Sequence, residues 1–335
     1  MPSLKIVLVL CMACILIGCD PLAPNATPVV IVITQTPVPT RTSPPLPTQT
    51  ATKLSLTSVP IVTTEAATVA SDEPPATESG CTQVKGQIVD LSFDSKILKA
   101  PMVYRAYLPP CYGESTRRYP YVILMPGSDK DETEWTDMLK ANQALEVGLT
   151  MQALPPMLLI MPRGGDLMNL NIFDENTSWE ALILKELMPD IQKNFCTWNA
   201  REGRAIGGIS RGGFWAFEIS FRHPELFSAV GGHSAFFDLN NAPPAYNPMS
   251  LAKTVNFSPG VQPRIWLDVA KADSVRTNIE IVQKTLAGRN IDPGYTMNSD
   301  GDHTVEYWTA HVSEYLSFYG QTWPRSVTEL PSCLQ

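Results

Sequence analysis

The stretch AIGGISRGG, residues 205–213, places one serine at the junction between a strand-like apolar run and a helix-like segment. Its centre reads Gly-x-Ser-x-Gly around Ser210, and FWAF at 214–217 continues the helical pattern. A sharp strand-to-helix turn of this kind exposes the hydroxyl, and its glycines let neighbouring backbone approach closely. The helix N-terminus then points its amides at developing negative charge. We therefore take Ser210 as a candidate nucleophile; a glycine-rich turn without chemistry is the alternative.

Apolar runs of strand length alternate with helix-like segments on both sides of this stretch. The strand-like runs are 121–125, 157–161, 205–209, 229–232, 265–270 and 295–298. The helix-like segments lie near 132–148, 178–194, 211–222, 274–288 and 304–319. Continuous apolar strands separated by amphipathic helices predict an α/β fold, with a mainly parallel central sheet and helices on both faces. Active sites in such sheets gather at the C-terminal ends of the strands, which is where Ser210 falls.

Four histidines compete to be the base that would activate Ser210. His223 ends a helix-like segment, where histidine is usually a cap, and His311 lies within the last helix-like segment. His303 lies in the loop between the last strand and the last helix, which delivers the base in folds with the order Ser, Asp, His. We therefore choose His303. His233, at another strand end, remains the alternative and could line the pocket or brace it.

The acid that orients the base should follow the preceding strand. Asp268 lies inside the run 265–270, so its side chain is expected to be buried against the sheet. Asp273 lies beyond the end of that run, in a loop that can reach His303, and we choose it, with Asp268 as the alternative. Its task would be to hold the imidazole tautomer and stabilise the imidazolium. Asp302, next to the histidine, is expected to serve local loop structure.

Two backbone amides are expected to bind the negative oxygen that forms during acyl transfer. One follows the first central strand, in the loop PGSD at 126–129, where Ser128 is favoured over Gly127. The other is the amide of Arg211, whose side chain we expect to be solvated. The loops 164–178 and 236–262 are expected to shape the pocket. Its candidate walls are His233, Phe173, Phe236, Phe237 and Tyr246.

The composition changes sharply near residue 80. All 7 Trp, 10 Tyr and 11 Phe, and all 4 His, lie in residues 81–335. A segment without aromatic side chains cannot easily form a packed core, so the chemistry is expected in 81–335, a single domain. The net charge is −8 and no long basic run occurs. This argues against nucleic acid as a partner, because phosphate binding needs clustered cations.

The N-terminus reads as an export signal followed by a tether. Residues 1–18 carry Lys5 and then an apolar run that is too short to span a bilayer comfortably. The run ends in LIGC, with Cys19 last, which resembles the bacterial lipoprotein lipobox and predicts lipidation of Cys19. An ordinary secretory signal is the alternative. Residues 19–80 are rich in Thr and Pro and are expected to be a disordered, extended spacer.

An antiparallel hairpin is expected at the start of the domain. Segments 85–92 and 101–108 alternate apolar and polar residues about a turn near residue 96. Partners about that midpoint have numbers that add to 192, and Cys81 and Cys111 satisfy this condition. We therefore predict a Cys81–Cys111 disulfide that closes the open end of the hairpin.

The remaining cysteines of the domain, Cys196 and Cys333, would then pair by elimination and pin the C-terminus. Free buried thiols are the alternative, but export favours disulfides. Outside the signal no CxxC occurs, and no paired His/Cys spacing typical of a metal site is present. We expect neither a metal nor an organic cofactor.

Several motifs carry a resemblance to a known family. They are YLPP at 107–110, PG at 126–127, GISRGG at 208–213, RHPELF at 222–227, Asp273, and GDH at 301–303 with Trp308. On these motifs residues 85–320 resemble the "Putative esterase" family of the α/β-hydrolases, which includes esterase D, enterochelin esterase, feruloyl esterase and antigen 85-like proteins. The sequence departs from relatives in its Pro-Gly loop, in Arg211 where methionine is commoner, and in Ala270 where glycine is common.

The resemblance implies an extracytoplasmic serine esterase that works through an acyl-enzyme, with Ser210, His303 and Asp273 in the family's order. The exterior location would suit esters of polysaccharides, siderophores or lipids. The protein is expected to be a monomer held on the outer face of a bacterial membrane by its lipid anchor. Two alternatives are an acyltransferase similar to antigen 85, which passes the acyl group to a sugar, and a non-catalytic surface binding protein on the same fold.

Overall fold

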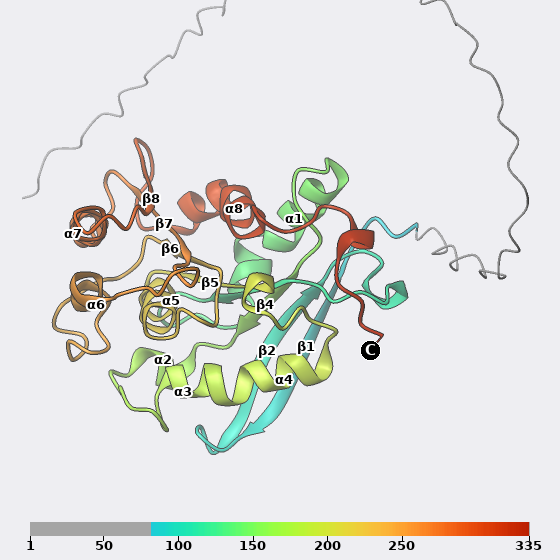
Figure 1. The fold of residues 1–335 in the computed structure, drawn as a ribbon, viewed down its shortest axis with the longest axis horizontal. Coiled ribbons are helices and arrows are strands. Elements are labelled where there is room, and N and C mark those ends of the chain that lie inside the picture. Colours follow the sequence, from blue (N-terminus) through green and yellow to red (C-terminus); the bar gives the residue numbers. More distant parts are fainter. Residues whose placement is uncertain (1–81, 335) are drawn as a thin grey trace, which may run out of the picture. The chain divides into compact units, whose positions relative to one another are not determined.

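The structure is a computed structural model and describes residues 82–334. The predicted signal, the predicted lipidation site Cys19, the predicted tether and Cys81 lie outside the described residues. Eight strands form one sheet in the order β1-β2-β4-β3-β5-β6-β7-β8 (Figure 1). The strands are β1 Gln87–Ser95, β2 Ala100–Leu108, β3 Tyr121–Met125, β4 Leu158–Pro162, β5 Arg204–Ile209, β6 Ala229–His233, β7 Arg264–Ala270 and β8 Gly294–Asn298.

The pairing within the sheet is antiparallel at one end and parallel elsewhere. β1 pairs antiparallel with β2, and β2 pairs antiparallel with β4. From β4 through β3 to β8 every neighbouring pair is parallel. Strands β3, β4, β5 and β6 are buried almost throughout, as expected for a parallel sheet that is covered on both faces. The predicted α/β class with an N-terminal hairpin is therefore confirmed.

The hairpin differs from its prediction in register. Gln87 pairs with Leu108 and Ser95 with Ala100, so partner numbers add to 195 and not to 192. The strands extend further toward the turn than the alternating pattern indicated. Four residues, 96–99, make that turn, and the Ser95 hydroxyl accepts a hydrogen bond from the Leu98 amide at 2.9 Å. The predicted Cys81–Cys111 pair stays a prediction, because Cys81 lies outside the described residues.

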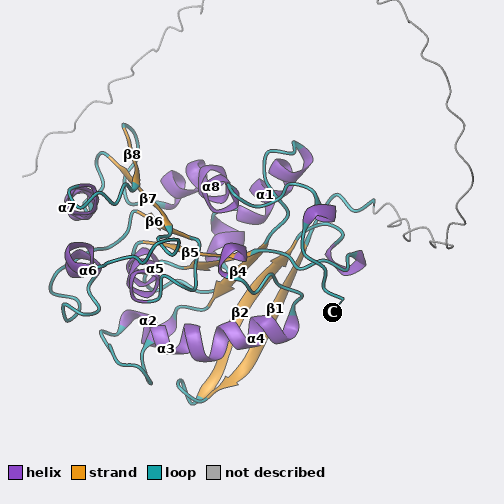
Figure 2. Cartoon of the chain, in the orientation of Figure 1, coloured by secondary structure: helices purple, strands orange, loops and turns teal. Residues whose placement is uncertain are grey.

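Helices cover both faces of the sheet (Figure 2). The helices are α1 Ala141–Thr150, α2 Gly165–Asn169, α3 Trp179–Leu182, α4 Met188–Asn194, α5 Arg211–Arg222, α6 Pro248–Thr254, α7 Arg276–Ala287 and α8 Val305–Gly320. A π-helical turn, Ile183–Leu187, joins α3 to α4 into one continuous rod. Helices α1 and α8 share one hydrophobic cluster, and α3 to α7 contribute to the cluster on the other face.

The helix expected near 132–148 is interrupted. Glu134–Met138 forms a π-helical turn, Lys140 has φ 59°, and only then does α1 begin. The physical reason is tertiary. The indole Nε1 of Trp135 donates to the Met125 carbonyl at 3.1 Å, and the Glu134 carboxylate accepts from the Gly127 amide at 2.7 Å. These bonds tie the segment to the end of β3.

The C-terminal segment is joined to the domain by a disulfide between Cys196 and Cys333, the pair expected by elimination. Their Cα atoms lie 6.1 Å apart. Backbone hydrogen bonds add to this link: the Cys333 amide donates to Thr116 and the Arg118 amide donates to Pro331, both at 2.7 Å. The segment after α8 is therefore pinned back across the domain.

One charged group in the core has an unusual environment. Glu218 on α5 is fully buried, and neither of its carboxylate oxygens has a hydrogen-bond partner within residues 82–334. The Nε atom of Arg222 lies 3.1 Å from one of these oxygens. Burial, together with the nearby negative charge of Glu180, raises the pKa of Glu218 well above its ordinary value, against the opposing pull of Arg222. The folded state therefore favours the protonated carboxyl.

We predict that Glu218→Gln stabilises the protein at high pH. A carboxyl with a raised pKa in the folded state contributes stability at low pH and loses it as the pH rises through that pKa. At about pH 8 the free energy of unfolding of the variant should exceed that of the wild type by about 1–2 kcal/mol. Near pH 4 the difference should vanish. Urea unfolding at both pH values measures it.

Glu180→Gln provides the matched control. The Glu180 carboxylate accepts from Arg222 at 2.8 Å and contacts His223 at 2.6 Å. Burial raises the pKa of Glu180, but these two partners outweigh burial and leave it lowered. Loss of that charge should destabilise the protein at neutral pH. Effects of opposite sign in the two variants are the expected result, and destabilisation by Glu218→Gln at pH 8 would refute the account.

Candidate active site

The candidate nucleophile lies on a strained turn between β5 and α5. Ser210 has φ 52° and ψ −115°, a region that non-glycine residues rarely adopt. Two hydrogen bonds hold it there. The Ser210 amide donates to the His233 carbonyl at 3.0 Å, and the Phe236 amide donates to the Ser210 carbonyl at 2.9 Å. Because His233 is the last residue of β6, the neighbouring strand fixes the shape of the turn.

Two glycines make this turn sterically possible. A Cβ atom on Gly208 would lie 2.5 Å from the carbonyl carbon of Gly212. A Cβ atom on Gly212 would lie 2.4 Å from the carbonyl oxygen of Pro126. The first glycine therefore lets the helix start close to the strand. The second brings the N-terminus of α5 against the loop that follows β3.

The structure brings the three predicted triad side chains together in one hydrogen-bonded chain. The Ser210 Oγ and His303 Nε2 atoms are 3.0 Å apart. His303 Nδ1 lies 3.0 Å and 3.1 Å from the two carboxylate oxygens of Asp273. The side chain of Asp273 is fully buried, whereas 28% of the His303 side chain is exposed. The imidazole thus has one polar neighbour on each nitrogen and an open edge toward solvent.

The environment of Asp273 keeps its carboxylate charged. Burial alone would raise the pKa of Asp273, but hydrogen bonds from His303 and from the Val275 amide outweigh burial, and the pKa is lowered. A negative carboxylate on Nδ1 favours the tautomer in which Nε2 can accept the serine proton. Asp302 has the local role expected of it, because its carboxylate accepts from the His303 amide at 2.7 Å.

In the loop after β3 the two predicted amide donors have different surroundings. The Gly127 amide donates to the buried Glu134 carboxylate at 2.7 Å, so Gly127 was a wrong candidate. The Ser128 amide has no acceptor within residues 82–334. At the start of α5, Arg211 carries one of the helix amides that lack an acceptor within the helix. Packing of Gly212 on Pro126 places this loop beside the helix start.

Glu134 is a site residue that the sequence did not mark. Burial raises its pKa, although the hydrogen bond from Gly127 opposes the shift. The sequence pattern does not indicate this role, because Glu134 lies in an irregular, π-helical turn that brings its carboxylate to the Gly127 amide. Its structural effect is clear: it binds the first amide of the loop and leaves the next one exposed.

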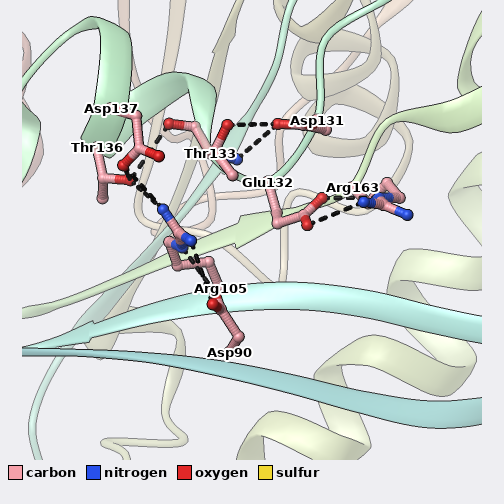
Figure 3. A network of polar contacts seen from close by, with 8 residues as sticks. All are labelled: Asp90, Arg105, Asp131, Glu132, Thr133, Thr136, Asp137 and Arg163. Atoms are coloured by element: carbon pink, nitrogen blue, oxygen red, sulfur yellow. Dashed lines mark hydrogen bonds and ion pairs between the residues drawn. The ribbon is translucent and has the colours of Figure 1, made fainter.

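Ion pairs fasten the continuation of this loop to the sheet, as Figure 3 shows. Arg105 on β2 bridges Asp90 on β1 at 2.7 Å and Asp137 in the π-helical turn at 2.9 Å. Arg163, directly after β4, binds Glu132 through two nitrogens at 2.8 Å and 3.1 Å. The segment from Glu132 to Asp137 is therefore held from two strands.

The side chain of Arg211 is buried, contrary to the expectation that it is solvated. Its Nε donates to the Met168 carbonyl at 3.0 Å, and one Nη donates to the Asn171 side chain at 2.9 Å. The guanidinium lies over the ring of Phe214, 4.5 Å from its centroid. Burial lowers the pKa of Arg211 to about 10, which leaves it charged at neutral pH. Arg211 therefore clamps the segment around α2 to the nucleophile helix.

Of the four aromatic residues predicted to line the pocket, three lie at or near the surface and one is buried in the core. Phe173 lines a cavity of about 430 Å³ together with Asn171, Asn240, Asn241, Ala242 and Pro243. Phe236 is 38% exposed and bonded to the serine turn. Tyr246 packs against Phe173 in a tilted arrangement, with ring centroids 5.6 Å apart. Phe237 is buried in the core, so it was a wrong candidate.

His233 does not line the pocket, because its side chain is fully buried. Its Nδ1 atom contacts Asp268, which lies inside β7. The Asp268 side chain bonds to tyrosines of α8 and not to Ser210, His303 or Asp273 within residues 82–334. His223 caps α5 and contacts Glu180 at 2.6 Å. His311 contacts Glu314 on the surface of α8. Of the four histidines, His303 is the one whose ring contacts the Ser210 hydroxyl within residues 82–334.

The described part of the chain contains neither a candidate metal site nor a helix that could span a membrane. Within residues 82–334, no three His, Cys, Asp or Glu side chains are arranged so that they could hold a metal ion. The same residues contain no helix that is both long enough and apolar enough to cross a membrane.

A mostly parallel sheet with a strained serine turn after β5 and a histidine after β8 defines the α/β-hydrolase fold. Residues 95–319 match the family described as "Putative esterase". Because the match covers more than half of the chain, the protein belongs to this family.

Individual relatives agree with this assignment. An endo-1,4-beta-xylanase/feruloyl esterase of Xylanibacter ruminicola is 30% identical over 155 residues, which is 44% of this chain and 21% of that protein. An esterase of Mycobacterium tuberculosis is 30% identical over 131 residues, 38% of this chain and 27% of that protein. The matched parts thus span about a fifth to a quarter of these relatives.

A solved ferulic acid esterase superimposes with a TM-score of 0.64 at 19% identity, covering 71% of this chain and 99% of that chain. At this level of identity the likeness concerns the fold.

We predict that Arg211→Met loosens the segment around α2. Methionine keeps an apolar stem over Phe214 but removes the charged hydrogen bonds to Met168 and Asn171. Loss of such bonds should lower the free energy of unfolding by about 1–3 kcal/mol. Limited proteolysis should become faster between residues 165 and 173. Arg276→Met on α7, whose partner is the surface residue Glu280, is the control and should change neither quantity. Unchanged proteolysis in Arg211→Met would contradict the clamp.

Proposed function

We propose that the protein is a serine carboxylic-ester hydrolase that works through an acyl-enzyme. The observation that carries this proposal is the hydrogen-bonded chain of Ser210, His303 and Asp273, with the serine on a strained turn at a helix N-terminus. Membership of the esterase family supports it. Nucleophile, base and orienting carboxylate are each within hydrogen-bonding distance of the next, which is the geometry that nucleophilic catalysis requires.

The reaction follows from this arrangement. The Ser210 Oγ attacks the ester carbonyl carbon while His303 Nε2 takes the hydroxyl proton, and the amides of Ser128 and Arg211 bind the oxyanion. The bond to the alcohol breaks, His303 gives its proton to the leaving oxygen, and the acyl group stays on Ser210. Water then attacks the acyl-enzyme with His303 again as base, which releases the acid and restores the serine. Asp273 stabilises the imidazolium in both halves.

The surroundings of the serine favour esters with an apolar acyl group. Four large apolar side chains are exposed on the two loops nearest the serine turn, namely Leu170, Ile172, Phe236 and Leu239. Large apolar side chains exposed close together commonly mark a binding surface. The hollow lined by Phe173 lies on the same two loops and carries three carboxamide groups, which can bind hydroxyls. The relative named as a feruloyl esterase points in the same direction.

We also propose that the enzyme acts outside the cytoplasm, held to the membrane by acyl chains on Cys19. The support is the sequence of residues 1–19, which lies outside the described residues. Two or three acyl chains on one residue give stable anchoring. Labelled palmitate fed to an expressing bacterium should appear on the wild-type chain and not on Cys19→Ser. Equal labelling of both chains would refute the anchor.

The direct test of the proposed reaction is Ser210→Ala. Removal of the nucleophile should reduce kcat for nitrophenyl butyrate by about 10⁴-fold or more, without a change in the unfolding midpoint, because the hydroxyl carries no structural bond other than that to His303. Ser313→Ala, at an exposed position on α8, is the control and should keep full activity. Undiminished turnover by the Ser210 variant would overturn the assignment.

A further inference from the structure

A buried polar cluster lies directly behind the candidate site, and the proposed reaction does not use it. We call it the tyrosine cluster; its members are Asp268, His233, Tyr307, Tyr315 and Tyr319. One Asp268 oxygen lies 2.6 Å from His233 Nδ1. The other accepts from the hydroxyls of Tyr307 and Tyr315, each at 3.0 Å. The Tyr319 hydroxyl lies 2.7 Å from His233 Nε2.

The cluster forms a closed set of donors and acceptors. Burial raises the pKa of Tyr307, Tyr315 and Tyr319 above that of free tyrosine, so their hydroxyls keep their protons and can donate. With Tyr319 donating to Nε2 of His233, Nδ1 carries the ring proton and donates to Asp268. The buried carboxylate then accepts three hydrogen bonds. A network satisfied in this way is rigid, and breaking any one bond leaves a buried polar atom unpaired.

The sheet is built to admit this cluster. A Cβ atom on Gly207 would lie 1.6 Å from the Tyr319 hydroxyl, and one on Gly231 would lie 2.3 Å from it. Both glycines are on central strands, where glycine ordinarily weakens a strand. Their positions create the slot in which α8 inserts Tyr319 next to His233. The cluster therefore fixes α8 against β6 and β7.

Tyr307 differs from the other tyrosines because it also touches the loop that carries His303. Its hydroxyl accepts from the Asn298 side chain at 2.9 Å, at the start of that loop. Gly301, in the middle of the loop, has φ +98° and lies against the ring; a Cβ atom there would be 2.6 Å from Tyr307 Cδ2. The Tyr307 amide contacts the Thr304 hydroxyl just after the loop, at 3.4 Å. The loop is thus shaped around Tyr307 at its start, middle and end.

We propose that Tyr307 is a positioning residue for the base. Asp268 holds the Tyr307 hydroxyl, Tyr307 supports the loop, and the loop holds the imidazole of His303 between Ser210 and Asp273. This inference rests on the proposed function. Catalytic groups need to be held to within about 0.5 Å of their productive positions, and a displacement of about 1 Å can cost roughly 100-fold in rate. Asp268, the alternative acid, therefore supports the base indirectly, through its hydrogen bond with Tyr307.

A matched pair of variants separates positioning from general stability. Tyr307→Phe and Tyr315→Phe each remove one hydroxyl, and each loses one bond to the same Asp268 oxygen at the same 3.0 Å. Tyr315 has no contact with the His303 loop among the bonds just described. Because Tyr307→Phe also loses the bond from Asn298, its unfolding midpoint should fall at least as far as that of Tyr315→Phe. With nitrophenyl butyrate, kcat should fall about 10-fold or more in Tyr307→Phe with KM within about twofold, and stay within about twofold in Tyr315→Phe.

A double-mutant cycle adds a second arm. Asn298→Ala removes the other polar partner of the Tyr307 hydroxyl, so its loss of kcat should not add to that of Tyr307→Phe. Equal losses of kcat in Tyr307→Phe and Tyr315→Phe, or no loss in Tyr307→Phe, would overturn the proposal. Additive losses in the double variant would do the same.

An NMR measurement keeps the test independent of turnover. The proton on His303 Nδ1, bonded to Asp273, reports the position of the imidazole even in a protein that hydrolyses no ester. Its resonance should shift or broaden in Tyr307→Phe and stay unchanged in Tyr315→Phe. If the wild-type protein shows no esterase activity that Ser210→Ala abolishes, the proposed function alone is refuted. If the resonance is unchanged in Tyr307→Phe, the positioning role alone is refuted.

Discussion

The backbone at Ser210 is the constraint on which the rest of the site depends. A positive φ at a non-glycine residue costs of order 1–3 kcal/mol and persists only where its surroundings enforce it. Here the enforcement comes from the end of β6, through the carbonyl of His233, and from the loop that follows it, through the amide of Phe236. The same turn aims the hydroxyl at His303 and brings the start of α5 to the loop after β3. One local distortion therefore sets the positions of the nucleophile and of both expected oxyanion donors.

Each partner of Ser210 is supported by groups that do not touch it. Asp273 is held by the Val275 amide, and its lowered pKa keeps it negative. The loop after β3 is held by Glu134, which occupies the amide of Gly127. These supports come from distant segments: Val275 precedes α7, and Glu134 lies in the π-helical turn before α1. Asp268 and Asp273 lie five residues apart, the first on β7 and the second after it. Asp268 belongs to the tyrosine cluster, whereas Asp273 contacts the proposed base His303.

Much of this arrangement could be read from the sequence because it depends on local pattern. The apolar run 121–125 is β3 to the residue, and the helix expected at 211–222 is α5. The order of serine, aspartate and histidine along the chain also led to the three side chains that meet in the structure. Buried parallel strands are continuous apolar runs, and catalytic loops follow them, so both can be recognised in the amino-acid sequence.

What could not be read depends on contacts between distant segments. The break at Lys140 arises because Trp135 bonds to the end of β3, which no helical periodicity encodes. The burial of Arg211 depends on carbonyls about 40 residues earlier. Likewise, the hairpin register could not be derived from alternation alone, because a pattern of period two fits several alignments.

The central claim is that Ser210 is an activated nucleophile whose reactivity depends on His303. Labelling of the full chain with a fluorophosphonate probe, followed by mass spectrometry of the digested protein, tests it most directly. We expect one adduct, on the peptide that contains Ser210, and a labelling rate that falls by about 100-fold or more in His303→Gln. An adduct on another residue, or equally fast labelling of the His303 variant, would contradict the account.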